Sequence, residues 1–378
     1  MQVVNKKMCV IVILVLVIIE SCTLFLMYKS FSNKNTNLDE VNLNISNSNM
    51  FAIMLEQDDG TYKEDTTSTW PTSGYTYNES MSGCIDINGN RIEDALTYDK
   101  ENNKANVNTT NTSYCYLYFS IKLPVFSEKI LSNVSAYSDI EYVADGYRYV
   151  GLNPNNYVTF NNETWRIIGF FDGDQIGMTS GKYYVKLIKE EAIGAIAYDE
   201  DEDTELDWSK TTLYTYLNNE YYNTLLNDSK DMIVNAKWYY YISSVYDLGV
   251  SNREEAYINE KSSQSSTLYD AVGLIYPSDW AYAVPAVHGC NDANLASYFD
   301  ESGCTSANWL ASKADMWSIF LLGSEYKADR AYYISSFGLS YTSASLEFNI
   351  YPVVYLSSDV TIKGSGNGSE TNKYELVL

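Results

Sequence analysis

The chain has 378 residues, of which 49 are acidic and 25 are basic, and its formal net charge at pH 7 is −24. This charge repels phosphate backbones and anionic lipid headgroups, so the composition argues against nucleic-acid binding. Tyrosine is abundant, with 36 residues, while charged residues make up 20% of the chain. Sizeable cores can therefore form while many amphipathic rings remain at the surface.

Residues 8–28 form an almost continuous apolar run behind two lysines. At about 1.5 Å per residue, a helix of this length matches a hydrocarbon core of roughly 30 Å. Glu20 costs about 2.5–3.5 kcal/mol at a helix centre, but the aliphatic residues around it offset that cost. We therefore expect residues 1–29 to be an uncleaved, single-pass anchor in the cell membrane, followed by an extracellular ectodomain; a cleaved signal peptide is the alternative.

Two segments with different composition follow the anchor. Residues 30–50 are dominated by Asn and Ser, which predicts a linker. Residues 51–122 are predicted to form a small all-β module, because short β-favouring runs alternate with turn signals. The predicted strands cover residues 51–55, 95–99, 105–109 and 114–121, the middle two forming a hairpin.

A second linker is expected over residues 123–146, before a larger domain over residues 147–378. Strands are predicted at residues 157–160, 164–171 and 183–189, and the first two form a hairpin turning at Asn161 and Asn162. Ser209 is a suitable helix N-cap, and Leu213, Leu217, Tyr221 and Leu225 recur every four residues behind it. Hairpins, a central helix and a loop-rich second half indicate an α+β fold.

Four of the six cysteines lie outside the anchor, and they allow three pairings. We expect Cys84 to pair with Cys115 and Cys290 with Cys304, because each bridge then stays inside one predicted domain. On the loop-entropy model each bridge stabilises its domain by about 3–4 kcal/mol. No pair has the Cys-x-x-Cys spacing of a zinc or redox site.

Short signatures recur along residues 147–378, at residues 165–169, 208–209, 216–222, 272–275, 308–310, 331–334 and 351–356. In their order they resemble a bacterial family of uncharacterised extracellular domains related to the sulfatase-modifying-factor branch of C-type-lectin-like folds. The resemblance implies a loop-rich scaffold whose late loops display a variable ligand surface, without implying catalysis. The front module, with its span from Cys84 to Cys115 followed by residues 116–119, resembles a small domain of membrane-anchored surface proteins of low-GC Gram-positive bacteria.

Departures from the superfamily put its best-known activities in doubt. Formylglycine-generating enzymes use a pair of core cysteines on a metal, whereas Cys290 and Cys304 look like a structural bridge here. Calcium-dependent lectins carry a Glu-Pro-Asn or Gln-Pro-Asp type of motif, and the chain has neither. His288 is the only histidine, so any histidine-based catalytic or metal site must use it.

The acidic run from Asp199 to Asp207 suggests calcium, because alternate carboxylates can converge on one hard cation. Asp199, Asp201 and Asp203 fit the opening of an EF-hand loop, but Thr204 stands where glycine is expected and Lys210 where the bidentate glutamate is expected. A solvated loop before the helix is therefore the favoured interpretation. No cofactor is expected, and calcium is the alternative.

Aromatic residues of the loop-rich half are the predicted ligand surface, since such rings stack on sugars or anchor protein partners. Core packing is the competing account, and Trp280 and Tyr282 are the preferred surface candidates, because the polar residues Ser278 and Asp279 flank them. We expect a non-enzymatic, adhesin-like surface protein that binds a glycan or another surface protein. A sulfatase-modifying-factor-like or wall-active enzyme, and an envelope assembly component using Glu20, are the alternatives. The predicted ligand-binding residues are Trp280, Tyr282, His288, Tyr332 and Tyr333.

Overall fold

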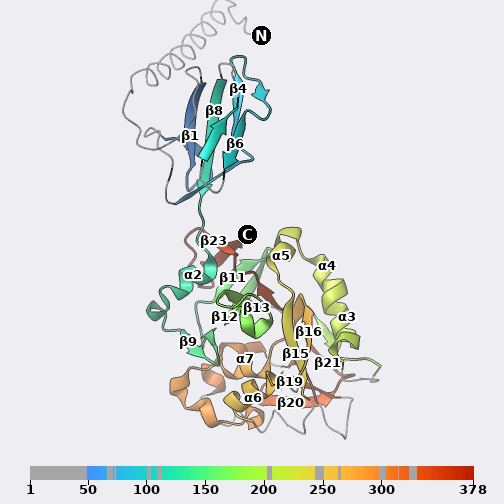
Figure 1. Cartoon of the computed structure of the whole chain (residues 1–378). Helices are drawn as coiled ribbons and strands as arrows, with labels where there is room; N and C mark the ends of the chain where they lie inside the picture. The colour runs from blue at the N-terminus through green and yellow to red at the C-terminus, as the bar shows by residue number, and fades with distance from the viewer. Residues whose placement is uncertain are drawn as a thin grey trace, which may run out of the picture. The chain divides into compact units, whose positions relative to one another are not determined.

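The computed structural model (Figure 1) divides the chain into two compact units at the boundary between Lys122 and Leu123. The predicted anchor at residues 8–28 lies outside the residues that the structure describes. Within those residues, no helix is long and apolar enough to cross a membrane. The described residues are 49–65, 71, 74–99, 104–108, 113–201, 207–242, 251–262, 265–297, 304–313, 315–322 and 330–378.

The first unit is built around one sheet with the strand order β2-β1-β8-β4-β5, in which β3 also pairs with β8. The central pair, β1 and β8, is parallel, and the predicted hairpin of β6 and β7 is confirmed as a separate antiparallel pair. The strands are β1 (Asn49–Glu56), β2 (Tyr62–Glu64), β3 (Tyr75–Tyr77), β4 (Gly83–Asp86), β5 (Arg91–Ile92), β6 (Leu96–Asp99), β7 (Lys104–Val107) and β8 (Ser113–Ile121).

A disulfide closes the sheet of the first unit. Cys84 of β4 and Cys115 of β8 are directly opposed in the register, with their Cα atoms 4.0 Å apart. The predicted pairing is therefore confirmed. The buried clusters around it are small, one centred on Ile53, Leu117 and Phe119 and the other on the cystine itself. A module with so little core depends on a covalent staple for a large part of its stability.

The second unit contains a nine-stranded sheet with the order β17-β22-β13-β12-β11-β24-β23, to which β10 and β9 are added beside β12. Strands β12 and β13 are buried along nearly their whole length, because both faces of the sheet are covered. The strands are β9 (Ile140–Val143), β10 (Gly146–Tyr149), β11 (Tyr157–Phe160), β12 (Glu163–Asp172), β13 (Tyr183–Lys189), β17 (Val272–Gly273), β22 (Val353–Leu356), β23 (Thr361–Lys363) and β24 (Tyr374–Val377).

A seven-stranded sheet completes the second unit, with the order β14-β21-β18-β15-β16 and with β19 and β20 attached to β18. One continuous hydrophobic core joins this sheet to the nine-stranded one. The strands are β14 (Ala195–Ala197), β15 (Ala236–Ile242), β16 (Ser265–Asp270), β18 (Met316–Leu321), β19 (Arg330–Ser335), β20 (Gly338–Ser343) and β21 (Glu347–Asn349). The predicted mixed α+β class agrees with this sheet-rich unit and its few short helices.

The helices are short, and α6 and α7 contact each other in the lower part of Figure 1. The α-helices are α2 (Phe126–Leu131), α3 (Thr212–Thr215), α4 (Tyr222–Thr224), α5 (Asn227–Met232), α6 (Arg253–Glu260) and α7 (Pro277–Ala281). The 3₁₀ turns are η1 (Val134–Ala136), η2 (Gly173–Ile176), η3 (Trp208–Lys210), η6 (Ala286–His288), η7 (Cys290–Asp292), η8 (Leu295–Ser297), η9 (Thr305–Ala307) and η10 (Trp309–Lys313). A predicted second disulfide, Cys290–Cys304, is confirmed among these turns.

The linker predicted over residues 123–146 is instead part of the second unit. It contains α2, η1, β9 and the start of β10. Phe126 and Ile130 lie four residues apart on α2 and are fully buried in the main core. The pair fits the period of a helix, and burial of these two side chains attaches the segment to the sheet.

The helix predicted behind Ser209 is confirmed in position but differs in geometry. Asp207 caps the 3₁₀ turn η3, and Thr211 then caps α3 by accepting a hydrogen bond from the Tyr214 amide at 3.1 Å. A π-helical segment, η4 (Tyr216–Tyr221), follows. Steps of four residues overshoot a regular α-helical turn by about 40°, so the wider π turn keeps the four apolar positions on one buried face. These positions are Leu213, Leu217, Tyr221 and Leu225.

Candidate functional site

A fully buried tyrosine fixes the start of the acidic run. The Tyr198 hydroxyl donates to the carbonyl of Ile319 in β18 at 2.7 Å, and the ring packs against Trp208 and Trp317. The next backbone amide, that of Asp199, donates to the Ala344 carbonyl at 2.9 Å. The carboxylates that follow are therefore presented from a fixed point between β14 and α3.

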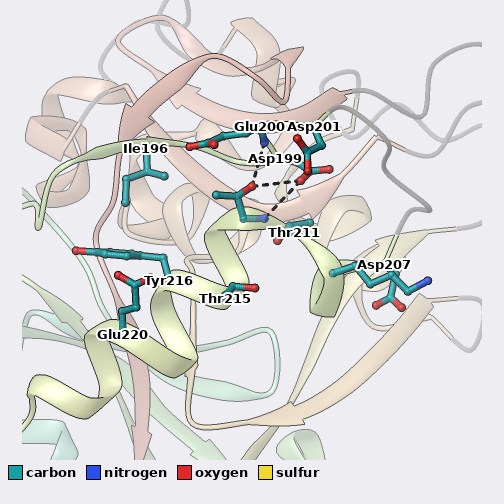
Figure 2. Close-up of a pocket in the computed structure, with 11 residues that line it drawn as sticks. Ile196, Asp199, Glu200, Asp201, Asp207, Thr211, Thr215, Tyr216 and Glu220 are labelled. Atoms are coloured by element: carbon teal, nitrogen blue, oxygen red, sulfur yellow. Dashed lines mark hydrogen bonds between the residues drawn. The ribbon is translucent and has the colours of Figure 1, made fainter.

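These carboxylates border an open pocket with a volume of about 600 Å³, which we call the acidic pocket. Figure 2 shows Asp199, Glu200 and Asp201 on one side of it and Tyr216 with Glu220 on the helical side. Five carboxylates and one lysine contribute, so the pocket favours cationic or hydroxyl-bearing groups over anions. The lining residues are Ile196, Asp199, Glu200, Asp201, Asp207, Lys210, Thr211, Thr212, Thr215, Tyr216 and Glu220.

The helical wall of the acidic pocket was not among the predicted site residues. Tyr216 and Glu220 lie four residues apart at the ends of a turn, on η4. Their side chains are at least partly exposed, whereas Leu217 beside them is buried. A sequence signal existed, because Tyr216 and Glu220 occupy positions next to the apolar four-residue repeat. Short π-helical segments occur frequently at functional sites.

The structure brings together two of the three residues predicted to open a calcium loop. Asp199 and Asp201 both line the acidic pocket, while Asp203 lies outside the described residues. The amide and the hydroxyl of Thr212 each donate to Asp199 at 3.4 Å. Among the residues described, no group of three or more His, Cys, Asp or Glu side chains is arranged to hold a metal ion.

The aromatic residues predicted to form a ligand surface do not lie together at the surface. Trp280, Tyr282 and Tyr332 are buried in the second unit, so their predicted exposure is wrong. Tyr333 is partly buried and packs against Phe348, with ring centroids 4.3 Å apart. His288 is exposed on η6, close in sequence to the second cystine. The free energy gained by burying these large rings exceeds the cost of burying the polar residues that flank them.

The segment around Trp280 instead contributes to a second cluster of charges, which we call the buried charge centre: Arg148, Lys186, Glu260 and Asp279. Arg148 comes from β10, Lys186 from β13, Glu260 from the end of α6 and Asp279 from α7. All four side chains are at least nine-tenths buried. Asp279 forms ion pairs with both Arg148 and Lys186, and the Lys186 pair is 2.5 Å long.

Burial shifts the proton equilibria of this centre. Burial raises the pKa of Glu260 to about 7, although Ser278 donates to it from its amide and its hydroxyl. Burial likewise lowers the pKa of Lys186, and Asp279 opposes that shift. Burial alone would raise the pKa of Asp279, but Lys186 and Arg148 together hold this pKa below its usual range. The centre is therefore a set of paired charges inside a region of low dielectric.

Comparisons with protein-family models, with curated proteins and with solved structures find no match to this chain.

Proposed function

We propose that the chain is a membrane-anchored extracellular surface protein whose second unit is a C-type-lectin-like, non-enzymatic module that binds a glycan or a protein through the acidic pocket. The anchor is proposed from the apolar run at residues 8–28. The C-type-lectin-like character is proposed from the resemblance of residues 147–378. The lining of the acidic pocket is the observation that carries the binding role.

The chemistry of the pocket wall supports this role. Carboxylates accept hydrogen bonds from sugar hydroxyls or from the ammonium and guanidinium groups of a protein, and the hydroxyls of Thr212 and Thr215 add further polar contacts. The ring of Tyr216 supplies an apolar face beside them, as sugar and protein ligands require. A pocket of this kind binds by many weak polar contacts around one aromatic anchor.

The covalent framework supports an extracellular location. Both cystines close loops inside their own unit, and disulfides persist in oxidising compartments. The oxidised thiols also support a binding role over nucleophilic cysteine chemistry. His288 lies on an exposed 3₁₀ turn and does not line the acidic pocket, which supports the same choice.

An array of glycans and surface proteins, probed with the full chain in detergent, tests the proposal. We expect reproducible binding that Tyr216→Ala reduces by at least tenfold, because the substitution removes the aromatic face while leaving the buried helix positions intact. Tyr142→Ala is the matched control, since Tyr142 is 59% exposed and does not line the pocket. Equal loss in both variants would count against the pocket as the site.

Two other outcomes would overturn the proposal. Turnover of a substrate by the full chain without added cofactor would contradict the non-enzymatic role. Recovery of the mature chain from cytosol with reduced thiols would contradict the location.

A further inference from the structure

Lys186 is placed as a buried amine in an aromatic enclosure. It is 0% exposed on the central strand β13. Its Nζ atom lies 3.9 Å from the ring centroid of Tyr276, 5.1 Å from that of Tyr355 and 5.4 Å from that of Trp238. Aromatic rings on several sides exclude water, so the hydrogen-bond partner of the Lys186 amine must be another group of the protein.

That partner is the Asp279 side chain, 93 residues away in sequence. Lys186 Nζ donates to Asp279 Oδ2 at 2.5 Å, and Asp279 is itself 2% exposed. The Cγ atom of Asp279 is one covalent bond from Oδ2. The amine nitrogen is thereby held close to the roughly 3–3.5 Å separation at which reacting atoms meet in near-attack conformers.

The second oxygen of Asp279 is occupied by a guanidinium. Arg148 donates from Nη1 to Oδ1, and its Cζ atom lies 4.6 Å from the ring centroid of Phe171. A fixed cation at Oδ1 stabilises negative charge that develops there when a nucleophile attacks Cγ. Arg148 therefore does for this oxygen what an oxyanion hole does in acyl transfer.

A further buried carboxyl lies beside these groups. Glu260 accepts from the amide of Ser278 at 2.9 Å, and Ser278 directly precedes Asp279 in the chain. Electrostatic interaction with both Asp279 and Lys186 contributes to its proton equilibrium, and its pKa of about 7 lets it take up and release a proton near neutrality. The other titratable groups that interact electrostatically with it are Tyr257, Lys261, Tyr276 and Tyr282.

We propose that Lys186 and Asp279 form an intramolecular isopeptide bond that covalently joins β13 to α7. The ammonium of Lys186 first passes a proton along its hydrogen bond to Oδ2, and the neutral amine then attacks Cγ with its lone pair. Glu260 accepts a second proton from the nitrogen and delivers it to the Oδ2 hydroxyl. The bond between Cγ and Oδ2 breaks, and Oδ2 leaves as one water molecule.

The reaction balances without an oxidant, a metal or a cofactor. One ammonium and one carboxylate become one neutral amide, and Glu260 ends in its starting state. Burying two charges carries a large desolvation cost, whereas a neutral amide carries much less, so the dry setting favours condensation. The cross-link would close a long loop and so restrict the unfolded chain, as a disulfide does.

Mass spectrometry of the full chain, reduced and denatured, tests the proposal. We expect an intact mass lower than that of the uncross-linked chain by one water, and a branched peptide joining Lys186 to Asp279 after digestion. Lys186→Arg retains a cation but has no comparable nucleophile. The intact mass of this variant should therefore equal that of its uncross-linked chain, with no water lost. Asp279→Asn should still cross-link by releasing ammonia, which gives the same product mass as the wild type.

An exposed ion pair supplies the matched control. Lys182 and Asp359 are 3.2 Å apart, but their side chains are 51% and 71% exposed. Because water solvates both charges, this pair should remain uncross-linked and no second water should be lost. A branched peptide at the exposed pair, or none at Lys186 in the folded wild type, would overturn the proposal. The wild-type measurement decides this even if a variant fails to fold.

The role of Glu260 is tested separately. Glu260→Gln should lower the cross-linked fraction of folded protein at least tenfold, and Glu260→Asp should restore part of it. Near-ultraviolet circular dichroism identifies the folded fraction, so a purely structural role would change that signal without changing the cross-linked share of folded molecules. Complete cross-linking of folded Glu260→Gln would remove Glu260 from the proposed step.

Discussion

The acidic pocket and the buried charge centre use the same residue types in opposite settings. The pocket gathers five carboxylates and one lysine around an opening to solvent. The buried charge centre balances two carboxylates against two cations and excludes water with aromatic rings. An unbalanced set of charges is tolerated where water screens it, whereas buried charges must be paired.

This difference separates two kinds of function within one unit. Exposed carboxylates such as Glu200, Asp201 and Glu220 can exchange partners, which suits reversible binding. Sealed charges are held in one geometry, and Lys186, Glu260 and Asp279 have altered proton affinities, which suits rigidity or a reaction between the paired groups.

The largest effect is expected for Asp279→Ala. The substitution leaves Arg148 and Lys186 buried without the carboxyl group that they share and also prevents the proposed cross-link, so it should cost at least about 3–5 kcal/mol of unfolding free energy. Asp201→Ala, at the exposed wall of the acidic pocket, should change it by no more than about 0.5 kcal/mol. Urea denaturation of the three proteins measures both values. Similar losses in the two variants would contradict the contrast between the settings.

The pH dependence of stability should report Glu260. An acid whose folded pKa exceeds its unfolded value favours the fold below the unfolded pKa, and this contribution is lost as pH rises through the folded pKa. For Glu260 the window runs from 4.5 to about 7. Across it, the wild type should lose on the order of 3 kcal/mol relative to Glu260→Gln.

Urea denaturation across that pH window tests the sign as well as the size. Glu254→Gln, at an exposed position on the same helix, should give a curve parallel to the wild type. A Glu260→Gln curve that also runs parallel to the wild type would show that Glu260 keeps an ordinary proton affinity.

Local patterns predicted much of the framework. The β-favouring run from Tyr114 to Ile121 predicted β8, and the apolar repeat starting at Leu213 predicted the helix. Each of these patterns is made by residues close together in the chain, so it can be recognised from the sequence alone. The two cystines were predictable because each closes a short loop inside one unit.

The buried charge centre could not be predicted in the same way. Asp279 meets Arg148 across 131 residues and Lys186 across 93, and no local spacing encodes those pairs. Without its partners, Asp279 looked like a polar neighbour that would hold Trp280 at the surface. Pairing removes the cost of burying the carboxylate, so the helix and its tryptophan enter the core.

A smaller effect is expected at the N-terminus of α3, the helix that borders the acidic pocket. Thr211 accepts from the Tyr214 amide at 3.1 Å and donates to the Trp208 carbonyl at 3.0 Å. Thr211→Ala removes both bonds and should cost about 1 kcal/mol of unfolding free energy, the usual value for a lost N-cap. Thr215→Ala is the matched control, because Thr215 lines the same pocket but is exposed within the helix. Equal effects in urea denaturation would argue against the cap.

The smallest effect is expected for calcium. A ligand that binds only the folded state raises the melting temperature, but Asp199 already accepts bonds from Thr212, and the run lacks the glycine and the late glutamate of an EF-hand. Millimolar calcium should therefore leave the melting temperature of the full chain unchanged, and Asp201→Asn/Asp203→Asn should behave alike. A rise in the parent chain that disappears in the double variant would reassign the acidic pocket as a metal site and end its contrast with the buried charge centre, because its carboxylates would then have a fixed counter-ion of their own.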